Sequence, residues 1–91
     1  MSTPLHVAAR KDRLAVVKLL IRHNADLNAR EVGGFTPLMW ASSNGRVAVA
    51  SELLRAGADR HAKGDDGATA LVMARKNGKH DVAVLLMNAE S

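Results

Sequence analysis

The 91-residue chain contains no cysteine and no tyrosine, and it has one phenylalanine, one tryptophan and two prolines. Without cysteine the protein can form no disulfide and perform no thiol-based catalysis, and this composition fits a reducing compartment. The shortage of aromatic side chains removes the stacking platforms that single-stranded nucleic acids bind. No apolar run approaches the ~18 residues that a membrane-spanning helix needs. The first residues do not follow the pattern of a signal peptide.

Side chains suited to catalysis or metal binding are present, but the sequence does not group them into a site. The four histidines do not follow metal-ligand spacing and have no cysteine to support them. The segment 64–67 lacks the lysine and the hydroxyl residue of a phosphate-binding loop. No serine has a nearby histidine and aspartate to activate it. We therefore predict that the chain is not an enzyme and binds no metal or cofactor.

The chain does contain a motif that returns every 33 residues. Thr36 is a favourable helix cap, and Pro37 suits the first helical position, where its missing N–H costs nothing. Gly34 precedes them at a turn that favours a positive φ. Similar text surrounds Thr3 and Thr69, each 33 residues away from Thr36. A fixed period of this length indicates a repeat array.

Other residues keep the same period. Leucine recurs in one phase at Leu20, Leu53 and Leu86, and Ala25-Asp26 returns as Ala58-Asp59. The pattern resembles the ankyrin family, whose repeats contain Gly-x-Thr-Pro-Leu-His-x-Ala, a glycine, an apolar stretch and Gly-Ala-Asp. The resemblance runs from Thr3 to about Met87. It implies one all-α domain over residues 1–91, a solenoid of helix-turn-helix units joined by β-hairpin-like loops.

Three repeats are predicted, over residues of about 1–30, 31–63 and 64–91, and the first lacks its leading hairpin. The family's motif is replaced at five positions, Met39, Val72, Ala70, Asp12 and Asn24. Asp12 and Asn24 stand in place of glycines that end helices. Because aspartate and asparagine tolerate a positive φ better than most residues, we expect a left-handed conformation at both.

Apolar spacing and helix-ending signals predict two helices in each repeat. The predicted ranges are Pro4–Arg10, Leu14–Arg22, Thr36–Asn44, Val47–Arg55, Thr69–Asn77 and His80–Asn88. Small residues on the first helix of each repeat, such as Ala41, allow close helix packing. The last helix is apolar almost all round from Val82 to Met87. Because solenoids need terminal repeats with a polar outer face, we expect either self-association or a fragment of a longer array.

The resemblance implies a non-enzymatic protein-interaction module, a scaffold that presents a concave surface to another protein in the cytoplasm or nucleus. It places partner-binding residues at the hairpin tips and at the ends of the first helices. The set is Arg10, Lys11, Val32, Gly33, Phe35, Ser43, Asn44, Asp65, Asp66, Ala68, Lys76 and Asn77. The sequence does not identify the partner.

Three further side chains have specific interpretations. Trp40 is equivalent to Val7 and Met73, so packing in the core is favoured over a role as a partner-facing hot spot. Phe35 stands at a position that the family leaves exposed. It can anchor a partner or fold back onto the next hairpin, and the sequence favours neither. His6 keeps the family's histidine, which implies that it ties neighbouring turns together.

Two alternative functions remain open. Basic residues recur in one phase at Arg13, Arg46 and Lys79, with Lys11 and Lys76 nearby, and the net charge is +4. This stripe could bind a nucleic acid, an acidic lipid or an acidic protein, although a solvated face is favoured. The text around Asn28 also resembles the hairpins that asparaginyl hydroxylases modify, with His61 in the equivalent position of the next repeat.

Overall fold

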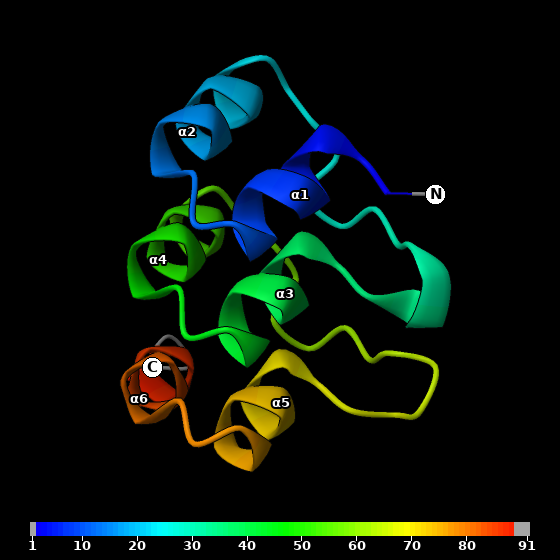
Figure 1. Ribbon diagram of the computed structural model, residues 1–91, viewed down its shortest axis with the longest axis vertical. Helices are drawn as coiled ribbons and strands as arrows, with labels where there is room; N and C mark the ends of the chain where they lie inside the picture. The colour runs from blue at the N-terminus through cyan, green and yellow to red at the C-terminus, as the bar shows by residue number, and fades with distance from the viewer. Residues whose placement is uncertain (1, 89–91) are drawn as a thin grey trace.

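The computed structural model describes residues 2–88, which form three stacked pairs of helices (Figure 1). The elements are α1 (Pro4–Arg10), α2 (Leu14–Arg22), the 3-10 turn η1 (Val32–Gly34), α3 (Pro37–Ser43), α4 (Val47–Arg55), α5 (Ala70–Lys76) and α6 (His80–Asn88). In Figure 1 the inner helices α1, α3 and α5 form one column and the outer helices α2, α4 and α6 form a second. Each helix packs on its partner and on the equivalent helix of the next pair.

The helix boundaries agree closely with the prediction. All three outer helices and α1 have the predicted ends, whereas α3 and α5 are one residue shorter at each end. The reason is that Thr36 and Thr69 are caps outside the helices. Their hydroxyls accept hydrogen bonds of 3.3 Å from the backbone N–H groups of Met39 and Val72, which lack a partner within the first turn.

The left-handed conformations predicted between helices are confirmed. Asp12 has a φ of 60° and Asn24 a φ of 63°. Their equivalents Gly45 and Gly57 have φ values of 71° and 101°. Only a few residue types tolerate this region, so these positions set where each helix ends. They fix the 33-residue spacing of the stack.

Two hairpin loops, residues 31–35 and 64–68, project beyond the inner helices, at the right of Figure 1. Each is closed by a turn: Gly34 N–H donates to Glu31 O at 2.8 Å, and Gly67 N–H donates to Gly64 O at 2.9 Å. Over the described residues the loops contain no strand. Their hairpin-like character therefore rests on the turns and on single backbone bonds across each loop, not on a ladder.

Hydrogen bonds join the two connecting segments to each other. Asp59 N–H donates to Asn28 Oδ1 at 2.8 Å, and Asp65 N–H donates to Gly33 O at 2.9 Å. Arg30 Nη1 donates to the carbonyl oxygen of Lys63 at 2.5 Å. These bonds join residues about one repeat apart, as the packing of the helices does. The loops and the helices therefore stabilise the same alignment of neighbouring repeats.

The core lies between the helix layers. Leu38, Val49 and Leu53 are at most 1% exposed, and Ala41 and Ala74 are fully buried. Close packing at these alanines confirms the role predicted for small inner-helix residues. Between residues 2 and 88 the structure has no helix that is long and apolar enough to cross a membrane.

One core residue breaks the rule that buried polar atoms are hydrogen-bonded. Among residues 2–88 Ser42 Oγ has no hydrogen-bond partner, although this side chain is 0% exposed. The equivalent position in the first pair is Ala9, also 0% exposed. An unsatisfied buried hydroxyl destabilises the folded state, and alanine is the better helix former.

Ser42→Ala is therefore expected to raise the free energy of unfolding by about 0.5–1.5 kcal/mol, measured by urea denaturation. The control is Ser43→Ala one residue later. Ser43 Oγ accepts a hydrogen bond of 2.8 Å from Asn77 Nδ2, so its removal should give no gain. A Ser42→Ala variant less stable than wild type would contradict this account of the position.

Candidate protein-binding surface

The ends of the inner helices form one side of the predicted surface. Arg10, Ser43 and Lys76 are the last residues of α1, α3 and α5. The residues that cap these helices are Lys11, Asn44 and Asn77. Because α1 packs on α3 and α3 on α5, the three helix ends lie in a row.

The polar residues in this row are held by the stack. Asn77 Nδ2 donates to Ser43 Oγ at 2.8 Å, which links two helix ends, and Asn44 Nδ2 donates to the carbonyl oxygen of Trp40 at 3.1 Å. Lys11 and Lys76 are exposed. The lysines therefore project into solvent, while the asparagines, of which Asn77 is also exposed, make hydrogen bonds that stabilise the row.

Trp40 lies beside this row and packs against the hydrophobic core, as the favoured prediction has it, but the core does not cover it completely. The side chain is half-buried. The guanidinium carbon of Arg10 lies 5.1 Å from the centre of its ring, a distance that favours cation–π attraction. Trp40 Nε1 donates a hydrogen bond to Glu31 Oε1. An indole N–H needs a hydrogen-bond acceptor, and at the edge of the core Glu31 supplies it.

Phe35 completes this group. Its ring centre lies 4.8 Å from that of Trp40 with an interplanar angle of 40°, within the range of favourable aromatic pairs. It packs against the inner helix of its own pair. We call Arg10, Glu31, Phe35 and Trp40 the tryptophan cluster. Two of its members were in the predicted binding set, and Glu31 and Trp40 were not.

The cluster is attached to the first helix pair by His6. His6 Nε2 lies 2.9 Å from the carbonyl oxygen of Phe35, and its Nδ1 lies 2.8 Å from Thr3 Oγ1. The ring is 0% exposed. The predicted tie between neighbouring turns is confirmed, and it fixes the backbone from which the Phe35 ring projects.

Glu31 supplies the negative charge of the cluster. Burial raises the pKa of its carboxyl. The hydrogen bonds from Ser2 and Trp40 and the electrostatic interactions with His6 and Arg10 outweigh burial, so the pKa of Glu31 is lowered overall. The carboxylate is therefore ionised at neutral pH, where it orients the indole and balances Arg10.

The tips of the hairpin loops extend the surface beyond the cluster. Val32 is 89% exposed, the most exposed large apolar side chain of the described residues. Asp65 and Asp66 are exposed at the second tip, and Asp66 Oδ1 accepts a hydrogen bond of 3.0 Å from Ala68 N–H. Gly33, with a φ of 86°, shapes the first tip. One tip is thus apolar and the other acidic.

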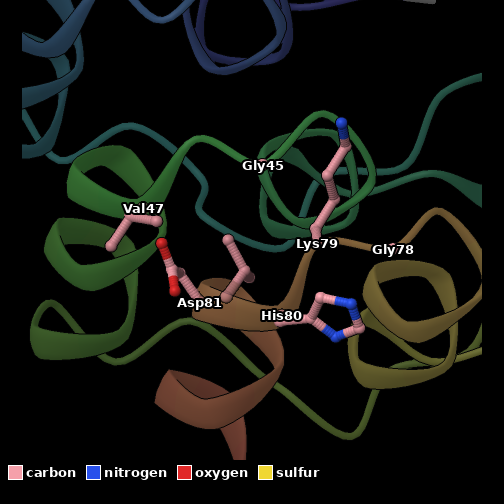
Figure 2. Close-up of a pocket in the computed structure, with 7 residues that line it drawn as sticks. Gly45, Val47, Gly78, Lys79, His80 and Asp81 are labelled. Atoms are coloured by element: carbon pink, nitrogen blue, oxygen red, sulfur yellow. The ribbon is translucent and has the colours of Figure 1, made fainter.

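Two side chains of the basic stripe lie against the helix stack. Arg46 Nε donates to the carbonyl oxygen of Arg10 at 3.2 Å, at the end of a helix where carbonyl groups lack partners. Figure 2 shows the Lys79 side chain extending past Gly45, and a Cβ at Gly45 would lie 2.9 Å from Lys79 Cδ. These two members of the stripe therefore cover the ends of the preceding helices.

The cleft drawn in Figure 2 offers no group of convergent side chains. It measures about 260 Å³ between the turn at Gly45 and the start of α6. His80 and Asp81 point to opposite sides of it (Figure 2). Within residues 2–88 no three metal-ligating side chains come together.

Asn28 is exposed, and its side-chain oxygen accepts the hydrogen bond from Asp59. Its backbone N–H donates to Asp26 Oδ1 at 2.9 Å. The side chain therefore joins two connecting segments. Hydroxylation at this residue stays a prediction.

The lowered pKa of Glu31 gives a pH dependence with a defined sign. A depressed folded-state pKa contributes stability that is present above the unfolded pKa and lost as the pH falls through the folded pKa. Wild type should exceed Glu31→Gln in free energy of unfolding at neutral pH. The difference should disappear only as the pH falls below the ordinary glutamate value of 4.5. Wild-type Trp40 fluorescence should change over the same range.

Glu31→Gln is also the control for the fluorescence, because glutamine does not titrate. A stability difference that is constant from neutral to acidic pH would contradict the role given to the carboxylate.

One comparison with known proteins bears on this architecture. A family model described as ankyrin repeats (3 copies) matches residues 1–63, more than half of the chain. Ankyrin repeats are generally protein–protein interaction modules and generally non-enzymatic. The stacked helix pairs, the threonine caps and the projecting loops agree with this match. The chain belongs to the ankyrin-repeat family.

Proposed function

We propose that this chain binds another protein with the surface formed by the tryptophan cluster, the two hairpin tips and the ends of the inner helices. The observation that carries the proposal is the placement of Trp40. A lone tryptophan, half-buried against Arg10 and Phe35, combines the residue types that dominate binding energies. We further propose that binding takes place in the cytoplasm or nucleus, in keeping with the lack of cysteine.

The cluster is ordered before any partner arrives. Trp40 is held by Glu31, Arg10 and Phe35, while Phe35 is held through its backbone by His6. Side chains that are already fixed lose little conformational entropy on binding, so more of the contact energy contributes to affinity. Val32 adds an exposed apolar contact at the tip of the same loop.

The charges around the cluster define the kind of partner. Arg10 and Lys11 lie at the end of α1, whereas Asp65 and Asp66 lie at the second hairpin tip. A complementary protein presents an apolar side chain to Val32 and Trp40, an acidic group to Lys11 and a basic group to the aspartates. A purely anionic partner fits less well because Arg46 and Lys79 are engaged within the stack.

The test is affinity capture with the whole chain as bait and quantitative mass spectrometry as the readout. Two baits alter the surface, Val32→Asp and Lys11→Glu. The matched control is Lys18→Glu, which makes the same charge change at an exposed position of α2. Circular dichroism confirms that each bait is folded.

A true partner is expected to bind wild type and Lys18→Glu equally and to bind Val32→Asp at least about tenfold less, the effect of losing a central contact. Lys11→Glu should also weaken it. If every captured protein bound all four baits equally, the result would contradict the proposed binding surface.

A further inference from the structure

Two asparagines of the chain, Asn44 and Asn77, are followed directly by glycine, and the others precede alanine. The side-chain amide of an asparagine can be attacked by the backbone nitrogen of the next residue, which closes a five-membered succinimide ring. Glycine permits this attack best, because it has no Cβ to obstruct the approach and its backbone adopts many conformations. The two Asn-Gly pairs are therefore the places where this chain modifies itself most readily.

Both pairs stand at the same position of their repeats, at the end of an inner helix. Asn44 and Asn77 cap α3 and α5, and the glycines that follow have φ values of 71° and 69°. The N–H groups of these glycines donate to Ser42 O at 3.3 Å and to Arg75 O at 3.1 Å. A nitrogen bound in this way cannot attack while the last turn is closed. The reaction therefore requires the helix end to fray, which helix ends do locally.

The two asparagine side chains are held by different partners. Asn44 Nδ2 donates to the carbonyl oxygen of Trp40 at 3.1 Å, four residues back in its own helix. Asn77 Nδ2 donates to Ser43 Oγ at 2.8 Å, on the neighbouring helix α3. The first acceptor belongs to the backbone and stays in place as long as the helix does. The second is a single hydroxyl on a half-buried side chain. The position of the Asn77 amide therefore depends on one side chain.

Asn77 is also the more accessible of the two asparagines, since it is exposed and Asn44 is half-buried. This exposure belongs to the position in the repeat. Lys11 is the equivalent residue of the first pair, and it is exposed although the second pair is stacked against α1. The position thus lies on the side of the stack, where the water that opens a succinimide ring can reach it.

We propose that Asn77 is a site of spontaneous deamidation and that Ser43 sets its rate by holding the amide away from the attacking nitrogen. The backbone nitrogen of Gly78 forms a bond to Cγ of Asn77, and the Cγ–Nδ2 bond breaks with release of ammonia. Water then opens the ring at one of its two carbonyl carbons. Opening at Cγ gives aspartate, and opening at the main-chain carbonyl carbon gives isoaspartate. Amide and water are thus converted to acid and ammonia, and no other reactant is required.

The product carries a negative charge where the unmodified chain has a neutral amide. The Ser43 hydroxyl can turn and donate to a carboxylate, so the aspartate form keeps the contact between α3 and α5. Isoaspartate lengthens the backbone at the cap and displaces the end of α5. The effect on binding rests on the proposed function. A partner that fits the amide of Asn77 meets a charge at the same point, so deamidation weakens its binding.

Peptide mapping by mass spectrometry tests the modification without any partner. The folded chain is incubated at mildly alkaline pH in water enriched in heavy oxygen and is then digested at acidic pH, where deamidation is slow. The heavy oxygen marks the residues that were converted during the incubation. Asn77 is expected to convert first and Asn44 more slowly. Asn28, which is exposed but precedes alanine, is the internal control and should convert least.

Three variants test the role of Ser43. Ser43→Ala removes the acceptor and should raise the rate at Asn77 by about two- to tenfold, the factor that the loss of one hydrogen bond represents. The rate at Asn44 should not change. Ser43→Thr keeps a hydroxyl and should restore the wild-type rate. Ser51→Ala, at a half-buried position of α4, is the matched control and should leave both rates unchanged. Circular dichroism confirms that each variant is folded.

The proposal would be overturned if Asn77 converted no faster than Asn28, or if Ser43→Ala left the rate at Asn77 unchanged. An equal rise at Asn44 and Asn77 would also overturn it, because a general loosening of the fold has that effect.

The effect on binding is tested separately, with Asn77→Asp as a further bait in the affinity capture. Proteins whose capture depends on Val32 and Lys11 should bind this bait less than wild type. Equal binding would contradict the effect of deamidation on binding. If no captured protein depended on Val32 and Lys11, the proposed function would fail, while the mapping experiment would still decide whether Asn77 is the site.

Discussion

The hydrogen bond from the buried His6 ring to the carbonyl oxygen of Phe35 joins the first inner helix to the first hairpin loop. A carbonyl only accepts, so Nε2 must carry the proton, and Nδ1 then accepts from the amide and hydroxyl of Thr3. Losing a partner from such a buried group costs about 1–3 kcal/mol. The backbone of Phe35 is fixed by this bond, and its ring is one wall of the tryptophan cluster. The proposed binding surface therefore depends on an interaction made beneath it.

The second junction is built differently, although its sequence is in phase with the first. Met39 replaces the histidine, fills the same space at 1% exposure and has no hydrogen to donate to the next loop. The connecting segments compensate through Asn28, Arg30 and the backbone of Asp65, each bonded across to its neighbour. The stack thus keeps one register with two sets of polar contacts. The helix ends therefore stay aligned across both junctions.

The 33-residue period predicted the features that recur in every repeat. It did not predict contacts that occur in one repeat only. Helix caps and left-handed helix ends depend on neighbouring residues, so the 33-residue repetition located them. For Trp40 the period identified the equivalent positions in the other repeats, but not how deeply the side chain is buried. At the equivalent positions Val7 is half-buried and Met73 is buried. The size and the N–H group of the indole therefore determine how deeply Trp40 is buried. Glu31 was missed since no periodicity relates a loop residue to the helix that it contacts.

The state of the His6 ring tests this account most directly. Nitrogen chemical shifts measured by NMR on the labelled chain distinguish the two tautomers of a neutral imidazole ring. We expect His6 to hold its proton on Nε2 alone, with that proton protected from exchange. The exposed His23 and His61 provide the comparison and should average between tautomers. A proton on Nδ1 of His6, or averaging like that of the exposed rings, would contradict the bond on which the surface depends.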